Sequence, residues 1–518
     1  MEGTIWAFLP AVIAIVLALI TKQVYVSLFL GIFVGAMMYA GGNPLNALFT
    51  LYQVMSEKVG GNTPIIVFLV VLGILVVLMQ KSGGAKAYGD WAGRKIKSKG
   101  GALAATAGLG SLIFVDDYFN CLTVGSVMRP VTDKFKISRA KLAYIIDATA
   151  APVCIIAPIS SWAAAVGSEL GDGGLMDFIK TIPFNVYAIL TLIMVFTLCF
   201  LKFDFGKMKR NDDIAEATGD LHAGAATGDE VTPEITPNPK GKVHHLIIPV
   251  IVLIVCCIGG MLFTGFFYNW DTGLIDTELQ SANFIEAFSN CDAGMSLAIG
   301  STIALVIIAI YYMIARVVSF KEITNSFTEG FKAMVPAILI LTFAWSISGI
   351  MGAKGGYLDA QAFVETNLAN SSFPQFLFPA IFFILAGAIA FATGTSWGTF
   401  GVLVPIAVTI LGGSTTLAVI TVSATLGGAV FGDHISPISD TTILASAGAE
   451  CNHVDHVNTQ LPYACVVAGI GVVAYIVAGL CSGLGGLLSA IIMWASALVL
   501  FAAVVCIIKL INKKKAAN

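Results

Sequence analysis

The sequence predicts an all-α polytopic membrane protein, and its composition and the length of its apolar runs support this prediction. The 518 residues are 57% hydrophobic and only 11% charged, with a mean hydropathy of +0.88, whereas soluble domains carry roughly 25% charged residues. Several apolar runs reach about 20 residues, the length of a helix that crosses a bilayer. The net charge of −3 gives no indication of partners, and no nucleic acid is expected. The lipid bilayer is the expected surrounding.

The apolar runs follow one another along the whole chain. Residues 5–20 have neither a basic segment before them nor a small-residue cleavage site, so we expect a retained helix and not a signal peptide. The runs fall at about 5–21, 24–41, 64–80, 102–130, 141–167, 182–201, 246–268, 293–315, 334–353, 374–411, 414–449, 462–481 and 487–511.

The placement of positive charges predicts the orientation. Lys and Arg gather in four places, whereas residues 271–292 hold five acids and no Lys or Arg. Because cytoplasmic loops carry an excess of Lys and Arg, the basic clusters are predicted to be cytoplasmic and the acidic loop external. We therefore expect a multi-pass protein of the bacterial inner membrane, with its N-terminus outside and its C-terminus in the cytoplasm. The four basic clusters are 81–99, 129–141, 202–245 and 509–515.

Two apolar segments are predicted to be re-entrant hairpins. Basic clusters flank residues 102–130 on both sides, so this segment should enter and leave on the cytoplasmic face, with Asp116 and Asp117 at its tip. Residues 374–411 are interpreted in the same way from the outside. The remaining runs then make eleven crossings. Non-helical backbone at this depth requires surrounding protein or a cavity.

The two halves of the chain resemble each other. Residues 79–90 (MQKSGGAKAYGD) resemble 351–359 (MGAKGGYLD), and APISS at 157–161 aligns with SPISD at 436–440. Each half is predicted to hold five crossings plus one hairpin, with discontinuous helices, and an odd number of crossings inverts the second half. The predicted domains are residues 1–201 (first inverted repeat), 202–245 (cytoplasmic flexible linker), 246–485 (second inverted repeat) and 486–518 (C-terminal transmembrane helix and basic tail).

Four breaks in the apolar runs, at residues 116–120, 157–161, 393–399 and 433–440, place carboxylates and hydroxyls at membrane depth. Ionisable residues there are rare and usually mark an ion or substrate pathway. Broken helices of inverted repeats meet near the midplane, so we expect the four breaks to converge. Carboxylate, hydroxyl and carbonyl oxygens suit a small hard cation such as Na⁺. The candidate ion- or substrate-binding residues are Asp116, Asp117, Asn120, Asp147, Ser160, Ser161, Thr395, Ser396, Asp433, His434, Ser436, Ser439 and Asp440, of which Asp117, Asp433 and Asp440 are the Na⁺ candidates.

Several of these residues have a structural alternative that needs no ion. Asp433 and His434 could form a buried hydrogen-bonded pair, and Asp147 could lie at the membrane interface. His453 and His456 follow the last break in a polar loop, where we expect solvated side chains; the alternative is a cytoplasmic pH-sensing role. The residues that could simply cap the following half-helix are Asp116, Asn120, Ser160 and Asp440.

The cysteines and histidines do not indicate an enzyme or a resident cofactor. The ten cysteines include no CxxC pair, and the six histidines form no HExxH pattern. Cysteines in apolar segments are best interpreted as small buried hydrophobic residues. The only ions expected at the site are the transported Na⁺ and H⁺.

Two stretches resemble the NhaC-type Na⁺/H⁺ antiporter family. They are residues 114–163, which begin FVDDYFN, and residues 431–448, which contain GDHISPISDTT, the most specific part of the similarity. The resemblance covers most of the chain. It implies an inverted-repeat carrier of the ion transporter superfamily, with paired hairpins, a scaffold domain and a homodimer. Some members of that superfamily exchange organic acids, so the resemblance indicates the architecture more closely than the cargo.

The predicted function is secondary antiport of Na⁺ (and Li⁺) against H⁺. A carboxylate in a low dielectric can hold a proton or a cation, and this competition couples the two fluxes. Residues 102–167 and 374–449 hold the polar intramembrane residues, so they should move like an elevator against a scaffold of residues 5–80 and 246–353. The alternative is a Na⁺- or H⁺-coupled exchanger of small carboxylates or amino acids. The absence of Lys and Arg near the four breaks argues against an anion.

Overall fold

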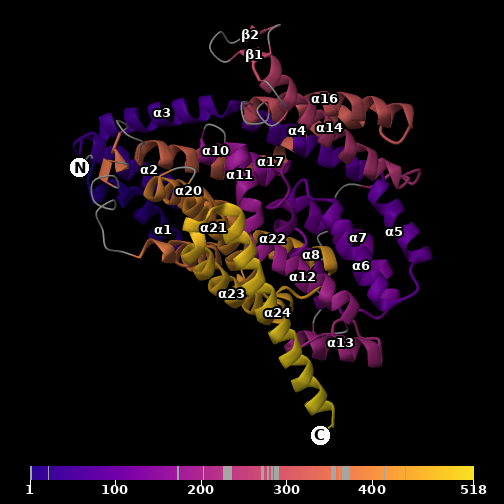
Figure 1. Cartoon of the computed structure of the whole chain (residues 1–518). Coiled ribbons are helices and arrows are strands. Elements are labelled where there is room, and N and C mark those ends of the chain that lie inside the picture. The colour runs from indigo at the N-terminus through magenta and orange to yellow at the C-terminus, as the bar shows by residue number, and fades with distance from the viewer. Residues whose placement is uncertain are drawn as a thin grey trace.

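The structure, a computed structural model of the chain, is almost entirely helical (Figure 1). The first half contains η1 (Ile5–Phe8), α1 (Leu9–Thr21), α2 (Val24–Tyr39), α3 (Pro44–Gly61), α4 (Thr63–Lys81), α5 (Gly84–Lys95), α6 (Lys99–Leu112), α7 (Asp117–Lys134), α8 (Arg139–Ala148), α9 (Ala151–Cys154), α10 (Ser161–Leu170), α11 (Gly174–Thr181), η2 (Ile182–Phe184), α12 (Val186–Leu201) and α13 (Gly206–Thr218).

The second half repeats this helical character and adds one short strand pair. Strands β1 (Tyr268–Asn269) and β2 (Leu274–Ile275) are antiparallel, with Tyr268 opposite Ile275. The helices are α14 (His244–Phe267), α16 (Ala293–Ile314), α17 (Phe320–Met351), η3 (Gln375–Leu377), α19 (Phe378–Thr393), α20 (Ser396–Leu411), α21 (Thr416–Ile435), α22 (Asp440–Ala449), α23 (His453–Cys481), η4 (Ser482–Leu484) and α24 (Gly486–Ala517).

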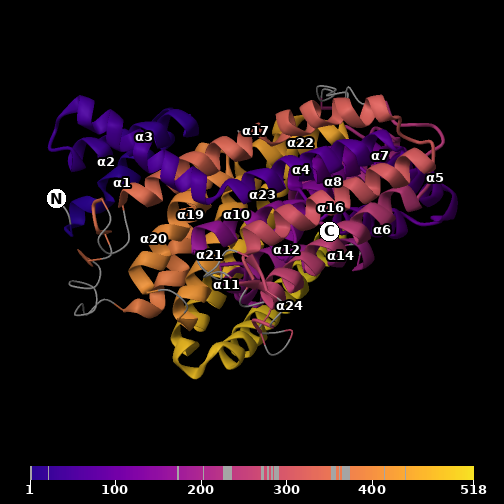
Figure 2. The same ribbon diagram turned by 90° about the horizontal axis from the view of Figure 1, so that it is seen from above.

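The structure describes most of the chain. The described residues are 3–21, 23–171, 174–201, 203–225, 236–269, 274–276, 279–281, 284, 287, 291–351, 357–360, 362–363, 374–412, 415–437 and 439–517. Within them, one large hydrophobic cluster runs through most helices, and a smaller one joins α1, α2 and α3 to the end of α17. Helices α1–α3 lie at one end of the molecule and α5–α7 at the other (Figures 1 and 2).

The helices confirm a polytopic membrane protein, and their number differs from the prediction. Among the described residues, seven helices are long and apolar enough to cross a membrane, or nine if each bent pair forms one span. Eleven crossings are not confirmed. The difference arises because several apolar runs are interrupted: the run at 141–167 is divided among α8, α9 and α10, none longer than ten residues.

Each half contains a helical pair followed by a broken helix. Helices α6 and α7 pack against each other around a break at residues 113–116, and α19 and α20 do so around Gly394 and Thr395. The broken helices are α8, α9 and α10 in the first half, and α21 and α22 in the second. The re-entrance of the pairs and the inversion of the halves remain predictions. Residues 352–356, which carry part of the sequence repeat, lie outside the described residues.

The predicted flexible linker contains an ordered helix, α13. Lys209 and Asp213 form an ion pair one turn apart along α13, and Gly219 ends the helix with a left-handed conformation (φ +80°). Lys141 of α8 is buried and lies 3.1 Å from Asp212 of α13. A flexible linker is therefore wrong for residues 206–218, because paired charges hold α13 on α8. Residues 226–235 of the linker lie outside the described residues.

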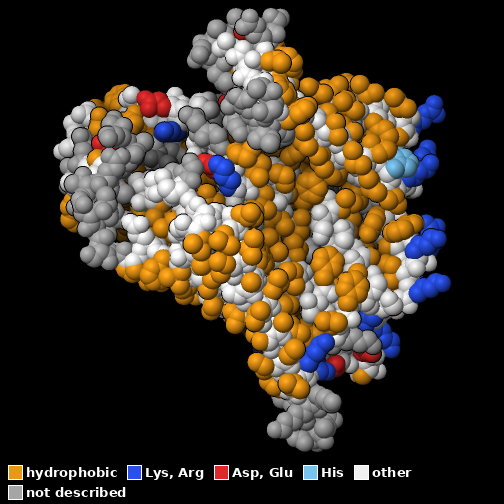
Figure 3. Space-filling model, viewed as in Figure 1, with side chains coloured by type: hydrophobic (Ala, Val, Ile, Leu, Met, Phe, Trp, Pro, Cys, Tyr) orange, Lys and Arg blue, Asp and Glu red, His pale blue; other side chains and the backbone are white. Residues whose placement is uncertain are grey.

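The surface agrees with lipid contact. Hydrophobic side chains cover most of the face shown in Figure 3, and the Lys and Arg side chains visible there lie mainly along one edge, over α5 and near α13. Helix α24 extends away from the other helices, and only 22% of its most apolar stretch is buried within the protein. A surface this apolar is expected where lipid tails replace water. The chain is therefore a multi-pass membrane protein.

Candidate ion-binding site

We refer to the pair α6 and α7 as the first hairpin and to the pair α19 and α20 as the second hairpin. An asparagine holds the break of the first hairpin. Asn120 lies one turn into α7, and its side-chain Nδ2 lies 2.7 Å from the Gly110 carbonyl and 3.0 Å from each of the Ile113 and Thr149 carbonyls. These carbonyls belong to the ends of α6 and α8, which have no partners of their own in the helix. Asn120 therefore fastens the hairpin tip to the first broken helix. Asp116 is also fully buried at this break.

The break of the first broken helix is organised by Ser160. Its hydroxyl accepts a hydrogen bond from the Ala163 amide (3.0 Å) and lies 2.8 Å from the Cys154 carbonyl. Ser160 is thus the cap of α10, as the structural alternative predicts. The Ser161 amide donates to the Val115 carbonyl (3.0 Å), so the break also contacts the tip of the first hairpin.

The second half has the same design at its break. Ser439 caps α22 by accepting a hydrogen bond from the Thr442 amide (3.1 Å), and the Ser436 hydroxyl donates to the Phe391 carbonyl (2.7 Å) at the end of α19. Thr395 caps α20, and its hydroxyl lies 3.4 Å from the Gly398 amide. The second hairpin and the second broken helix are thereby held together at their breaks.

Asp433 lies where α20, α21 and α22 meet. Its carboxylate is fully buried, and Oδ2 accepts hydrogen bonds from the hydroxyls of Thr441 (2.9 Å) and Ser396 (3.5 Å). Thr441 is a residue that the sequence reasoning missed, although it directly follows Asp440. Helix α22 begins at Asp440, whose side chain lies outside the described residues. A carboxylate surrounded by hydroxyls and by the carbonyls of a helix break offers the oxygen ligands that a small hard cation uses.

Asp117 has different partners from Asp433. Its Oδ2 accepts a hydrogen bond from the Trp162 indole (3.0 Å), and its Oδ1 lies 3.2 Å from the Tyr118 amide. The Trp162 ring packs against the ring of Trp397 at a centroid distance of 5.7 Å. Because Trp397 follows Ser396, this aromatic contact joins the tip of the first hairpin to the second hairpin.

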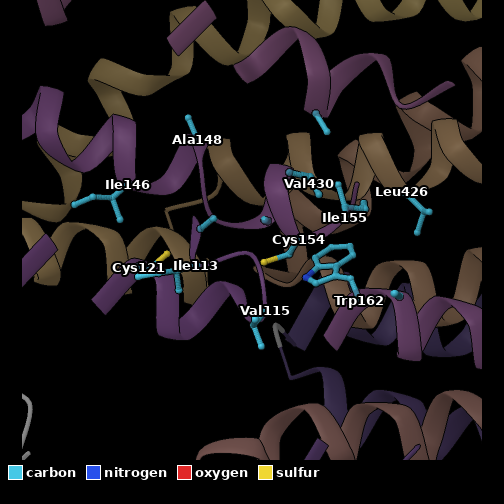
Figure 4. Packing of buried hydrophobic residues seen from close by; sticks show 14 of the residues in the cluster. Ile113, Val115, Cys121, Ile146, Ala148, Cys154, Ile155, Trp162, Leu426 and Val430 are labelled. Carbon is cyan, nitrogen blue, oxygen red and sulfur yellow. The ribbon is translucent and has the colours of Figure 1, made fainter. Parts of the chain in front are cut away.

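Apolar side chains fill the space around the breaks (Figure 4). Val115, Cys154 and Trp162 from the first half and Leu426 and Val430 from the second half belong to one buried cluster. An apolar surrounding excludes water and strengthens electrostatic interactions inside it. The gain or loss of one charge by a polar group at the breaks therefore changes its electrostatic energy more than it would in water.

A second polar group forms around Asp147, inside the protein. Asp147 is fully buried, and its Oδ2 accepts hydrogen bonds from Gln460 Nε2 (2.7 Å) and the Thr442 hydroxyl (3.1 Å). His456 Nε2 lies 3.4 Å from the same oxygen. The expectation of a solvated His456 is wrong, because α23 begins at His453 and turns His456 into the protein, where it is fully buried.

The two other histidines near the site have separate partners. His434 Nδ1 lies 3.0 Å from the Tyr187 hydroxyl. His453 Nε2 lies 2.8 Å from the Pro437 carbonyl, so this partly exposed residue at the start of α23 also contacts the break. The sequence did contain a signal for His456 and Gln460, since they are four residues apart and share one face of a helix. Within the described residues, no group of three or more His, Cys, Asp and Glu side chains could hold a metal ion.

Broken helices that meet around buried carboxylates in a multi-pass membrane protein define a secondary transporter. Residues 168–480 match the Na⁺/H⁺ antiporter family, and the chain belongs to this family. The chain is 39% identical to an uncharacterised protein of Haemophilus influenzae over 505 residues, which are 94% of this chain and 93% of that protein.

Two further similarities are to a curated antiporter and to a solved transporter structure. Over 147 residues (28% of this chain and 30% of the other) the chain is 31% identical to the malate-2H⁺/Na⁺-lactate antiporter of Bacillus subtilis. The crystal structure of the Alcanivorax borkumensis YdaH transporter matches with a TM-score of 0.50 at 15% identity, covering 90% of this chain and 98% of that one. The chain is therefore a secondary antiporter with a transporter fold.

Proposed function

We propose that this protein exchanges Na⁺, and also Li⁺, for H⁺, and that Asp433 is the residue where the two compete. The observation that carries this proposal is the fully buried Asp433 carboxylate with the hydroxyls of Thr441 and Ser396 at 2.9 and 3.5 Å. Asp117 and Asp440 are the other acids proposed to contribute to cation binding. The cation is cargo, so the site has to release it on the opposite side.

The competition follows from electrostatics. In a low dielectric, a carboxylate without a counter-ion is costly, so it binds either a proton or a cation. With the cation bound, the Thr441 and Ser396 oxygens turn their lone pairs toward it; with the proton bound, these hydroxyls remain donors or acceptors to the carboxyl group. Because each state neutralises Asp433 once, movement of the loaded site exchanges one ion for the other.

We propose an elevator motion for the release step. The hairpins and broken helices are joined to one another by the contacts of Asn120, Ser161, Ser396 and Ser436, so they are suited to move as one body. The proposed scaffold consists of α1–α4, α14, α16 and α17, and it would also carry the contacts of a homodimer. The proposed setting is the bacterial inner membrane, with the N-terminus outside and the C-terminus in the cytoplasm.

A second candidate function is coupled exchange of a small organic solute. The relative that supports it is the malate-2H⁺/Na⁺-lactate antiporter, which matches over 147 residues. A carboxylate substrate would need cationic or helix N-terminal partners. Near the described breaks, the capped starts of α10 and α22 at Ser160 and Ser439 are the groups available for that purpose. Small carboxylates and amino acids are therefore the proposed alternative cargo.

The test is flux into proteoliposomes with imposed Na⁺ or pH gradients. We expect Na⁺-dependent proton movement in the unmodified protein and its loss in Asp433→Asn, which keeps the size of the side chain and removes its charge. Asp213→Asn is the matched control, because Asp213 is an exposed acid on α13. If Asn replacements of Asp117, Asp433 and Asp440 each left proton-coupled Na⁺ flux unchanged, the organic-solute exchanger would be the better function.

A further inference from the structure

The polar group formed by Asp147, Thr442, His456 and Gln460 shares no side chain with the group of Asp433, Thr441 and Ser396. We refer to these four residues as the Asp147 cluster. They come from α8, α22 and α23, and all four are fully buried. Two donors converge on a single oxygen, Asp147 Oδ2, at 2.7 Å (Gln460) and 3.1 Å (Thr442), and His456 Nε2 lies 3.4 Å from the same oxygen. The cluster joins the first broken helix to the second half of the chain.

The cluster has hydrogen-bonding capacity that the described residues do not use. Among these residues, Asp147 Oδ1, Gln460 Oε1 and His456 Nδ1 have no hydrogen-bond partner. His456 Nε2 lies 3.4 Å from Asp147 Oδ2, which is longer than an ordinary hydrogen bond between nitrogen and oxygen. Buried polar atoms are nearly always bonded, so an unused set of this kind points to something that binds there.

The smallest species that this set can bind is a proton. An imidazole and a carboxylate at this separation carry a net negative charge when His456 is neutral and become a neutral ion pair when it is protonated, with a stronger and shorter contact. Resting on the proposed Na⁺/H⁺ exchange, we propose that Asp147 and His456 form a proton-binding site separate from Asp433, and that Thr442 couples this site to the cation.

The coupling rests on the single hydrogen of the Thr442 hydroxyl. Its Oγ1 lies 3.1 Å from Asp147 Oδ2 and 3.3 Å from the Asp433 carbonyl. When His456 is neutral, the hydroxyl donates to Asp147 and leaves the Asp433 carbonyl available to a cation. When the imidazolium occupies Asp147 Oδ2, the hydroxyl donates to the carbonyl instead, and the cation loses that oxygen. A proton on the pair therefore opposes cation binding.

Gln460 supports the same connection. Its Nε2 lies 2.7 Å from Asp147 Oδ2 and 2.6 Å from the His434 carbonyl, in the last turn of α21. Two side chains thus join Asp147 to the two consecutive carbonyls of residues 433 and 434. A shift of the Asp147 carboxylate on protonation of the pair is transmitted directly to the end of α21, where the helix breaks.

Other titratable groups face the pair. On α21 they are Asp433 and His434, and on α7 Cys121. Tyr187 on α12 interacts with Asp147, and Asp455 on α23, bonded to Asn211 of α13, interacts with His456. At the start of α8, Lys141 is neutralised by Asp204 and by Asp212 of α13. His434 and His456 are the described groups facing Asp147 that can carry a positive charge, and His456 Nε2, 3.4 Å from Asp147 Oδ2, forms an ion pair with it when protonated.

The first test is the protonation of His456 in the purified full-length protein. NMR of ¹³C-labelled histidine side chains follows the titration, and His456→Gln identifies the signal. We expect this signal to change with pH within about pH 5–8, the range in which histidine changes its charge, and Asp147→Asn to alter that change, because the imidazolium loses its partner. His453→Gln, on the same helix, is the control and should leave the signal unchanged. An His456 signal that is constant over this range, or insensitive to Asp147→Asn, overturns the proposal.

The second test is proton release on addition of Na⁺ to weakly buffered protein, followed with a pH-indicating dye. We expect about two protons per chain from the unmodified protein, one displaced from Asp433 by the cation and one from the Asp147–His456 pair by linkage between the two sites. Thr442→Val should lose the second of these, about half of the release, whereas Thr442→Ser, which keeps the hydroxyl, should retain both. Equal release by the Val and Ser variants would overturn the coupling through Thr442.

The two tests separate this inference from the proposed function. If His456 titrates in an Asp147-dependent way while Na⁺ releases no proton, the proton site stands and the assignment of Na⁺ as cargo fails. If Na⁺ drives proton exchange that requires Asp433 while His456 does not titrate, the proposed function stands and the Asp147–His456 site fails.

Discussion

The two broken helices have the same serine cap at their breaks and differ in the side chain that lies near it. In the first, Ser160 caps α10, and in the second, Ser439 caps α22 in the corresponding place. The residue six positions before each capping serine differs: Cys154 in the first half and Asp433 in the second. The serines thus serve the fold of both halves, whereas the buried carboxylate at this position belongs to one half. A repeated architecture can therefore carry an asymmetric site.

The first half supplies its own acid at a different place. Asp147 lies at the end of α8, and its hydrogen-bond partners Thr442 and Gln460 both come from the second half. The two acids are therefore not equivalent by symmetry, and each depends on groups of the second half. This comparison leads to four predictions, ordered from the largest expected effect to the smallest.

The first prediction tests whether the halves are inverted. Lys97, Lys136 and Thr415 are exposed positions beside the two hairpins. Single cysteines at Lys97 and Lys136 should react only with a reagent on the cytoplasmic side, and a cysteine at Thr415 only with one on the external side, because the hairpins are predicted to open in opposite directions. The measurement is labelling in oriented vesicles, in a background without reactive cysteines. Labelling of all three positions from one side would contradict the predicted inversion of the two halves.

The second prediction concerns the starts of the two broken helices. Helix α8 starts beside the buried ion pair of Lys141 with Asp204 (2.7 Å) and Asp212 (3.1 Å), whereas α21 starts with an uncharged cap, Thr415. Lys141→Met leaves two acids without this partner, and should lower the free energy of unfolding by about 3–5 kcal/mol. Denaturant unfolding in mixed micelles measures it.

The control for this prediction is the exposed pair on α13. Lys209→Met removes an ion pair whose side chains are both solvent-exposed, and we expect a change below about 1 kcal/mol. Similar losses for Lys141→Met and Lys209→Met would show that α13 does not hold α8.

The third prediction compares the tips of the two hairpins. Asn120 reaches three carbonyls of α6, α8 and the first break, whereas Thr395 caps only α20. Asn120→Ala should therefore destabilise the protein by about 2–3 kcal/mol, since buried carbonyls lose their donor. Thr395→Ala should cost about 1 kcal/mol. Both are measured by unfolding, and an equal effect of the two changes would contradict the difference between the hairpins.

The fourth prediction separates capping from cation binding. Ser160→Ala and Ser439→Ala each remove one cap and should lower stability by about 1 kcal/mol. Only Ser439 lies near the Asp433 group, with its hydroxyl 3.2 Å from that of Thr441. We therefore expect Ser439→Ala alone to weaken apparent Na⁺ affinity, by about 1 kcal/mol, as measured from the Na⁺ dependence of flux. Equal loss of affinity in both variants would make the two breaks equivalent.

Much of the fold could be predicted from composition and from the breaks in hydrophobic runs. Apolar length indicated the spanning helices, and prolines and serines indicated where α10 and α22 begin. The helices α3, α5, α11 and α13 were missed, because they contain too many polar residues to stand out as apolar runs. Their stability comes from tertiary contacts, which a hydropathy pattern does not contain.

The site residues could be predicted only where one segment of the sequence by itself contained an unusual polar or charged residue. Asp433 was recognisable because a charge is rare within an apolar run. The partners of Asp147 were not, since Thr442 and Gln460 are 295 and 313 residues away in the sequence. His456 seemed solvated because its neighbours are polar. The start of α23 at His453, which turns His456 inward, is a property of the folded chain.

The segment between the two halves, residues 221–238, is hydrogen-bonded to the rest of the protein at both ends. Leu221 accepts a hydrogen bond from the Arg139 amide at the start of α8, and the Asn238 amide donates to the Lys81 carbonyl at the end of α4. One anchor thus lies on the part proposed to move and the other on the proposed scaffold. The length of chain between Leu221 and Asn238 allows the two anchors to lie at most roughly 58 Å apart, at about 3.4 Å per residue. Deleting residues from this connection should therefore limit the proposed movement while every proposed ligand of the ion stays in place.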